Sequence, residues 1–406
     1  MPRTIMTNVY IARQPIYNRR LQVEGYELLF RSGEENRADV HDRDRATSTV
    51  LRNAFMEIGL GHLVGEKPAF INFTRNLLLD RESFPYPYEK VVLELPAYLE
   101  PDAEVVAAVA DLRRRGCRFA LDNFGFSDPR VPLVDLVDYI KLNLQELGLE
   151  KIPELMGHLG GCEAKLLAHC VESQQEYVAC RELGIDHFQG FFFCRPEIVK
   201  GRRLPASRLS TIRLLSQLQS PDVTIEELEK IIAQDVSLSY RLLRYLNSVQ
   251  FGLVSKIDSI RHAVSYLGLD NLRVWASVIL LARIDEKPVE LLKTSLVRGK
   301  MCELLGRESG ESDHGMFFMV GLFSTLEALL DLPIGDILQD LPLAEGIKLA
   351  LLGYAGSPGE ALACVLAYER GEWDAVDDAP YPGDTVSQAY LRAIAWAEET
   401  IGEVAG

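Results

Sequence analysis

The sequence predicts an α/β domain followed by an all-α domain, with the first folded as a (β/α) barrel. Short β-rich runs alternate with helical runs from Val9 to about Pro205. Most of these runs are apolar on both sides, as expected for strands that are covered on two faces. After Pro205 the strand pattern disappears and only helical periodicity remains. We therefore expect two domains, residues 1–205 and residues 206–406.

Eight β-rich runs supply the strands of the predicted barrel. They are Val9–Ile16, Leu21–Phe30, Ala69–Phe73, Val91–Leu95, Arg118–Leu121, Tyr139–Leu142, Lys165–Ala168 and His187–Phe191. The first two flank Asn18-Arg19-Arg20 and are expected to form an antiparallel hairpin. Helices are expected over Ala46–Ile58, Ala103–Arg114 and Gln174–Leu183. This alternation predicts a TIM-like (β/α) barrel with an initial hairpin.

Composition limits the classes of function. The 406 residues carry a formal net charge of -16, which argues against nonspecific binding of nucleic acid or of anionic membranes. No signal-peptide pattern opens the chain, and the longest apolar run, Val274–Ala282, is about half a membrane span. Seven cysteines without a Cys-x-x-Cys pair indicate reduced thiols. We expect a cytoplasmic protein that can hold a small polyanion only in a local pocket.

Polar side chains fall at the carboxyl ends of the predicted strands, where barrel active sites collect. They are Glu27, Asn72, Glu94, Asp122, Asn123, Lys141, Asn143, Glu172 and Gln189. A single buried carboxylate often has only a structural partner, but this many strand ends favour a site. Glu27, Asn72, Glu94 and Asp122 offer only oxygen ligands, which Mg²⁺ or Mn²⁺ prefers. With Lys141 beside them, they predict a pocket that binds a phosphoester.

The first half resembles the EAL-domain phosphodiesterases, which hydrolyse cyclic di-GMP to its linear dinucleotide. The resemblance runs in order through about residues 9–200. It rests on Gln14-Pro15-Ile16, Glu27-Leu28-Leu29 with Arg31, Asn72, Glu94, Asp122-Asn123-Phe124-Gly125, Lys141-Leu142-Asn143, Glu172 and Gln189-Gly190. It implies ligand binding by Gln14, Arg31 and Gln189. It also implies a metal site of Glu27, Asn72, Glu94, Asp122 and Glu172, and catalysis by Lys141 and Glu172.

Several departures from the family pattern concern catalysis. Asn123 and Asn143 stand where the family has aspartates associated with a second metal and the attacking water. An amide supplies one oxygen and no charge, so metal affinity and water activation should both fall. Cys170 replaces a glycine and His169 a carboxylate, and Phe126–Pro129 departs from the loop that couples dimerisation to metal binding in the family. We therefore expect a degenerate domain with Mg²⁺ or Mn²⁺ at one site or none.

The second half resembles the HDOD module, an output domain related to HD-type phosphohydrolases. The match runs from Asp235 to Ser248 and through Gly268, is clear over 206–285 and weakens toward the C-terminus. His262 and His314 are its only histidines, and no His-Asp pair accompanies them, which argues against metal-dependent hydrolysis there. Tyr240, Leu243, Tyr245 and Phe251 either form a partner groove or belong to the core.

Three functions compete at this point. The preferred one is a bacterial signal-transduction protein in which a degenerate EAL domain binds cyclic di-GMP, or has lost it, and the HDOD domain relays to a protein partner. The first alternative is an active Mg²⁺- or Mn²⁺-dependent phosphodiesterase that produces linear pGpG. The second is a pure protein-interaction scaffold. A homodimer through the EAL-like domain is a further expectation, whereas direct contact with nucleic acid or membrane is not expected.

Overall fold

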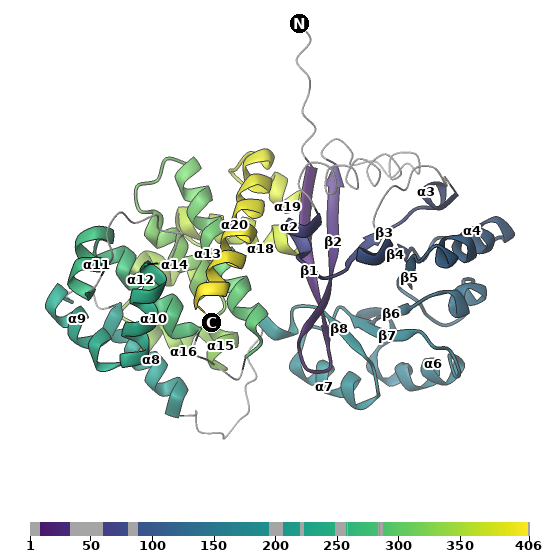
Figure 1. The fold of residues 1–406 in the computed structure, drawn as a ribbon, viewed down its shortest axis with the longest axis horizontal. Helices are drawn as coiled ribbons and strands as arrows, with labels where there is room; N and C mark the ends of the chain where they lie inside the picture. The colour runs from purple at the N-terminus through teal and green to yellow at the C-terminus, as the bar shows by residue number, and fades with distance from the viewer. Residues whose placement is uncertain are drawn as a thin grey trace, which may run out of the picture. The chain divides into compact units, whose positions relative to one another are not determined.

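The computed structural model describes residues 9–32, 60–79, 88–194, 206–219, 223–247, 257, 259–282, 284 and 287–404 (Figure 1). The chain forms two compact units that change over between Phe193 and Cys194, with residues 369–373 grouped with the first. The predicted helix Ala46–Ile58 lies outside the described residues.

Eight strands close into a barrel in the first unit. They are β1 (Val9–Asn18), β2 (Val23–Ser32), β3 (Ala69–Asn72), β4 (Val91–Leu95), β5 (Arg118–Leu121), β6 (Tyr139–Asn143), β7 (Lys165–His169) and β8 (His187–Gln189). Strand β1 pairs antiparallel with both β2 and β8, and the other neighbours are parallel. The predicted TIM-like barrel with an opening hairpin is confirmed.

Strand β8 is shorter than predicted, because it ends before Gly190. Gly190 has a φ of 148°, and a Cβ there would lie 2.0 Å from the carbonyl oxygen of Val171. The two backbones also exchange hydrogen bonds, with the Val171 N–H donating to Gln189 O. Only glycine fits this close approach, which fixes the end of β8 against the segment that follows β7.

Helices connect the parallel strands. They are α2 (Leu60–Val64), α3 (Arg75–Leu79), α4 (Ala103–Arg114), α5 (Leu144–Leu147), α6 (Ile152–His158) and α7 (Gln174–Glu182). Helix α4 begins where predicted, because the Asp102 side chain accepts a hydrogen bond from the Val105 N–H. A capping box of Ser173 and Glu176 starts α7.

The connection between β5 and β6 is described throughout, and its only helical element is a short 3₁₀ helix, Val131–Leu136.

The second unit is helical, as predicted. The helices described from residue 206 onward are α8 (Ala206–Leu218), α9 (Ile225–Gln234), α10 (Val236–Leu246), α11 (Ile260–Leu267), α12 (Leu269–Leu281), α13 (Val289–Glu308), α14 (His314–Phe323), α15 (Leu326–Leu330), α16 (Ile334–Asp340), α17 (Glu345–Gly353), α18 (Gly356–Arg370), α19 (Trp373–Asp377) and α20 (Gly383–Val404). Helices α13 and α14 approach closely at Gly321, where a Cβ would lie 2.3 Å from Arg298 O.

The aromatic residues proposed for a partner groove in this half do not share one surface. Tyr245 is buried and its ring centroid lies 4.4 Å from that of Trp275, whereas Tyr240 is 64% exposed. Leu243 is half-buried, and Phe251 lies outside the described residues. Tyr245 therefore belongs to the helical core, and of this set only Tyr240 presents a largely exposed ring in the described part of the chain.

One stretch, Glu345–Arg370, is long and apolar enough to cross a membrane by length and composition alone. It is divided between α17 and α18, and Tyr354 and Gly356 between them have φ of 55° and 70°. The 15 residues of α18 span about 22 Å at 1.5 Å per residue, short of a hydrocarbon core of about 30 Å. The stretch therefore consists of two shorter helices and is not one continuous helix.

Candidate functional site

The buried barrel residues form an apolar layer with a polar layer next to it. The apolar layer consists of Ile16, Phe70, Val92, Ala120, Tyr139 and Leu167. Side chains alternate along a strand, so residues two positions apart face the same way. Two positions further along the five strands β3–β7 stand Asn72, Glu94, Asp122, Lys141 and His169, and two positions earlier on antiparallel β1 stands Gln14. The strand period therefore places the predicted polar residues together at the carboxyl ends.

Lys141 lies at the centre of this polar layer. Its ammonium Nζ lies 3.0 Å from Glu27 Oε2, 2.8 Å from Glu94 Oε1 and 3.2 Å from Asp122 Oδ1. Lys141 and Glu94 are buried, with exposures of 1% and 0%. When all four groups are ionised, three carboxylates surround one ammonium and leave two negative charges in excess. Such an excess, removed from water, requires a further cation or a proton.

Gln189 ties the closing strand to this cluster. Its Nε2 donates to Glu27 Oε2 at 2.5 Å and to Gln14 Oε1 at 2.8 Å. The strand register explains the meeting, because Gln14 pairs with Glu27 and Ile16 pairs with Gln189. The structure thus brings together Gln14, Gln189 and Glu27, three residues that the sequence predicted for the site.

The pKa values of the two glutamates shift in opposite directions. Burial opposes ionisation of Glu27, but the Lys141 charge and the Gln189 hydrogen bond hold its pKa below the usual value. Burial and then the charge of Glu27 raise the pKa of Glu94 well above its usual range. Burial works against the Lys141 ammonium, yet the three carboxylates raise its pKa. Without a further cation, Glu94 is therefore the group at which a proton relieves the excess charge.

Asn123 and Asn143 lie beside the cluster and bond to each other. The Asn143 Nδ2 donates to Asn123 Oδ1 at 3.3 Å, and the Asn143 Oδ1 accepts from the Gln145 N–H at the start of α5. Asn123 has a φ of 49°, in the left-handed region that asparagine adopts more readily than most residues. Two carboxylates at these positions would repel each other, whereas the two amides satisfy one another.

His169 ends β7 at the same edge, and Cys170 directly follows it. Burial, followed by the Lys141 charge, lowers the pKa of His169 to about 4, and its Nε2 has no hydrogen-bond partner among the described residues. Cys170 has a φ of 58°, a conformation that glycine adopts without strain. Burial raises the pKa of the Cys170 thiol, so the side chain is a neutral thiol near pH 7.

The remaining predicted residues lie less deeply or outside the described part. Asn72 lines a pocket with Asp122 and Asn123, and in the register it pairs with Glu94. Glu172 follows β7 with an exposed side chain, and its backbone N–H donates to Glu176. Arg31 belongs to β2, but its side chain lies outside the described residues.

The donors of the cluster have the chemistry of a divalent-cation site, although Lys141 fills its centre. They are carboxylate oxygens, and when ionised the three carboxylates exceed the Lys141 charge by two negative charges. The buried Glu94 Oε2 has no hydrogen-bond partner among the described residues. In the same part of the chain, no group of three or more His, Cys, Asp or Glu side chains is arranged to hold a metal ion. The oxygen donors therefore have the chemistry that a hard divalent cation needs, while the Lys141 ammonium occupies the space between three of them.

Family models match both halves of the chain. The EAL domain matches residues 6–196, and the HDOD domain matches residues 204–332. "Cyclic di-GMP phosphodiesterase CdgJ" from Vibrio cholerae is 34% identical over 403 residues, which cover 97% of this chain and 93% of the relative. "Uncharacterized protein YuxH" from Bacillus subtilis is 32% identical over 96% of this chain and 98% of its own. The chain belongs to the EAL–HDOD family.

Solved structures match the EAL domain. A standalone EAL protein from Vibrio cholerae in a c-di-GMP-bound form is 21% identical, covers 47% of this chain and 92% of its own, and has a TM-score of 0.38. The manganese and cyclic di-GMP complex of BlrP1 from Klebsiella pneumoniae is 21% identical over 47% of this chain and 57% of its own, with a TM-score of 0.40.

We predict opposite stability effects for two isosteric changes in the EAL domain. Glu27→Gln removes an ionised acceptor from Lys141 and should cost about 2–3 kcal/mol in the free energy of unfolding. Glu94→Gln replaces a group whose neutral form the fold favours, so at pH 7 it should leave the metal-free protein at least as stable as the wild type.

The sign of the pH dependence follows from the two pKa shifts. The raised pKa of Glu94 stabilises the fold at low pH, and this contribution is lost as the pH rises above the usual glutamate range. The lowered pKa of Glu27 stabilises the fold above that range and is lost on acidification. Urea unfolding in EDTA at pH 4, pH 6 and pH 8 measures both variants. Equal losses in the two variants at all three pH values would contradict the opposite shifts.

Proposed function

We propose that the protein is a cytoplasmic bacterial signalling protein in which a degenerate EAL domain binds cyclic di-GMP. In this proposal one Mg²⁺ or Mn²⁺ accompanies the ligand, hydrolysis is slow or absent, and the HDOD domain relays the bound state to a protein partner. The net charge of -16 makes nucleic acid and anionic membranes poor partners for the protein surface.

The Lys141 cluster carries the proposal. Three carboxylates with an excess of two negative charges surround Lys141 inside the barrel, where a divalent cation would compensate them. A cation held there would attract a phosphodiester, and the displaced Lys141 ammonium would be free to contact its oxygens. The relative from Vibrio cholerae, whose name states a cyclic di-GMP phosphodiesterase, is matched over nearly the whole chain, which supports the choice of ligand.

The amide pair supports binding over hydrolysis. Asn123 and Asn143 bond to each other, and neither supplies the negative charge that a second divalent cation needs. Hydrolysis by a pair of metals uses the second ion to activate water, so a site with one ion would bind the diester and cut it slowly. The name of the Vibrio cholerae relative favours the alternative, an active phosphodiesterase that produces linear pGpG.

We predict that the purified full-length protein binds cyclic di-GMP in the presence of Mn²⁺ and that Glu27→Ala weakens this binding at least about tenfold. Isothermal titration calorimetry with and without Mn²⁺ measures both. Glu24→Ala is the matched control, because Glu24 lies three residues earlier on β2 and bonds to Asn18 and His187. Cyclic di-AMP controls for the base. No binding of cyclic di-GMP at high micromolar concentration would leave the scaffold hypothesis.

We predict that Asn123→Asp with Asn143→Asp raises the rate of pGpG formation in Mn²⁺, because the pair would regain the charge for a second cation. The same double variant should be less stable in EDTA by about 1 kcal/mol, since the two carboxylates repel each other. Chromatography of the product measures the rate, and Asn271→Asp in the HDOD domain controls for an added charge. An unchanged rate would place the limit elsewhere, for example in Phe126–Pro129.

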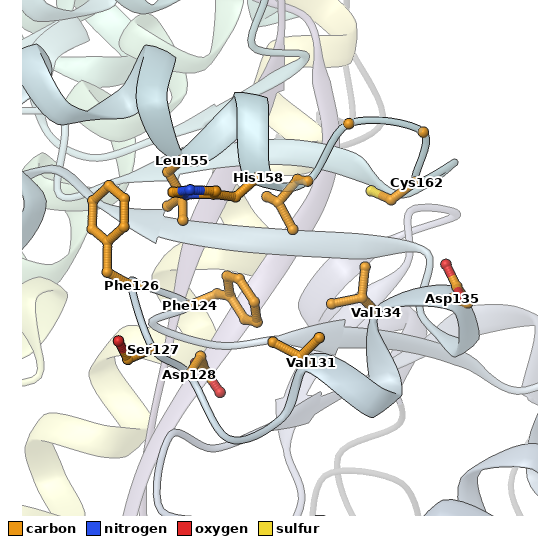
Figure 2. A pocket seen from close by; sticks show the side chains of 14 residues that line it. Phe124, Phe126, Ser127, Asp128, Val131, Val134, Asp135, Leu155, His158 and Cys162 are labelled. Carbon is orange, nitrogen blue, oxygen red and sulfur yellow. The ribbon is translucent and has the colours of Figure 1, made fainter.

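We further propose that the EAL domain forms a homodimer through a groove beside the 3₁₀ helix Val131–Leu136, whose lining combines exposed apolar side chains with Asp128 and Asp135. Figure 2 shows Leu155 and His158 of α6 above this pocket and Val131 and Val134 below it, with Phe126 at its left end, where the Phe126 ring centroid lies 5.8 Å from that of His158. The pocket has a volume of about 580 Å³, and Phe126 and Val131 are 38% and 60% exposed. The only helical element of the β5–β6 connection is this six-residue 3₁₀ helix, so the connection contains no α-helix that could cover the groove.

Phe126→Glu should therefore convert a dimer to a monomer, because it places a charge where the proposed contact would bury an exposed aromatic ring. Sedimentation velocity of the full-length protein measures the change. Tyr266→Glu, at an exposed tyrosine of α11, is the matched control and should leave the dimer intact. A wild-type protein that sediments as a monomer at all concentrations would rule out the dimer.

A further inference from the structure

Arg130 is a buried arginine in the loop that follows β5. Its side chain is 0% exposed, and that of Asp128 is 7% exposed. Two bonds join them as a fork, from Arg130 Nε to Asp128 Oδ1 at 2.9 Å and from Nη2 to Oδ2 at 2.6 Å. The Arg130 backbone N–H also donates to Asp128 Oδ1 at 2.8 Å. The guanidinium charge is thus compensated locally, and its position is fixed by a bidentate pair.

The remaining guanidinium contacts go to the backbone of the candidate site. Arg130 Nη1 donates to Leu95 O at 2.8 Å, and Nη2 lies 3.4 Å from Asn123 O. Leu95 directly follows Glu94, and Asn123 directly follows Asp122. The Leu95 carbonyl also accepts the Asp122 N–H at 3.0 Å. The Leu95 carbonyl oxygen therefore accepts hydrogen bonds from both the Arg130 guanidinium and the backbone N–H of Asp122.

The loop that Arg130 closes has a backbone that needs external support. Asn123 and Ser127 have φ of 49° and 57°, in the left-handed region that non-glycine residues rarely occupy. Arg130 spans this loop, with Asp128 at one end and Leu95 and Asn123 at the other. A lysine would keep the charge but could not reproduce the planar fork.

We propose that Arg130 is a positioning residue that fixes the separation of Glu94 and Asp122 and so sets the affinity of the site for a divalent cation and cyclic di-GMP. This inference rests on the proposed function for its ligand. Arg130 acts through the Leu95 and Asn123 carbonyls, whereas Glu94 and Asp122 themselves contact Lys141. Cation coordination tolerates only small changes in the distance between carboxylates, so a loosened loop would weaken binding.

Arg130→Lys in the full-length protein tests the proposal, with Asp128→Asn as a second variant that breaks the fork from the other side. Arg113→Lys is the matched control, because the exposed Arg113 donates to a backbone carbonyl, Asp135 O, of the same β5–β6 connection. Calorimetry with Mn²⁺ alone, and with cyclic di-GMP in Mn²⁺, is done at a temperature at which circular dichroism shows every variant folded. We expect Arg130→Lys and Asp128→Asn to weaken both affinities at least tenfold, and Arg113→Lys to change them less than twofold.

Hydrogen exchange provides a readout that needs no ligand. Arg130→Lys should speed exchange of the Asp122 and Phe124 amides, which bond to Leu95 O and Lys141 O, and leave the amides of β7 unchanged. Unchanged exchange at Asp122 and Phe124, or equal acceleration throughout the barrel, would overturn the positioning role. If the wild type binds, affinities of Arg130→Lys and Asp128→Asn equal to those of the wild type would also overturn it. If the wild type binds neither Mn²⁺ nor cyclic di-GMP, the proposed function fails, and local exchange alone decides whether Arg130 positions the two strand ends.

Discussion

The ammonium of Lys141, buried among three carboxylates, is the interaction on which the rest of the EAL domain depends. Glu94 lies fully buried, and no single partner could compensate the whole set. Lysine meets the requirement as a compact charge that donates hydrogen bonds to Glu27 and Glu94 and lies 3.2 Å from Asp122 Oδ1. The compensation is incomplete, because two negative charges remain in excess when all the groups are ionised. The same cluster therefore links β2, β4 and β6 and the residue after β5 in the metal-free barrel, and it keeps an excess negative charge that a further cation would compensate.

The barrel architecture converts this local requirement into a site. Parallel strands end at the same edge of the barrel. Because side chains alternate along a strand, the residue two positions beyond the apolar layer faces the same way, and on several strands this residue is polar. Strand β1 reverses this geometry, because it runs antiparallel to both neighbours. Gln14 nevertheless reaches the polar layer, since it stands two positions before Ile16 rather than after it. Gln189, which pairs with Ile16 and bonds to Gln14, then holds the opening hairpin to the last strand.

Much of the fold and site could be predicted from the sequence, because strand ends are read directly from the pattern. Strands β4 and β5 have their predicted bounds, and Glu27, Glu94 and Asp122 meet as expected. The centre of the cluster could not be predicted, since three-dimensional packing decides whether Lys141 faces the carboxylates or a ligand. Arg130 was missed for a related reason. An arginine in a loop normally lies in solvent, and nothing in the local sequence indicates that the Leu95 carbonyl, 35 positions earlier, accepts its hydrogen bond.

The departures from the family pattern form a consistent set when the charge balance is considered. Asn123 and Asn143 remove two carboxylates from a layer that already carries excess negative charge, and they satisfy each other without a cation. His169, held neutral by burial, adds no positive charge to offset the cluster near pH 7. The metal-free barrel therefore needs to compensate only the charges around Lys141. If the domain binds its ligand as proposed, this charge balance lets the bound and unbound states both be stable.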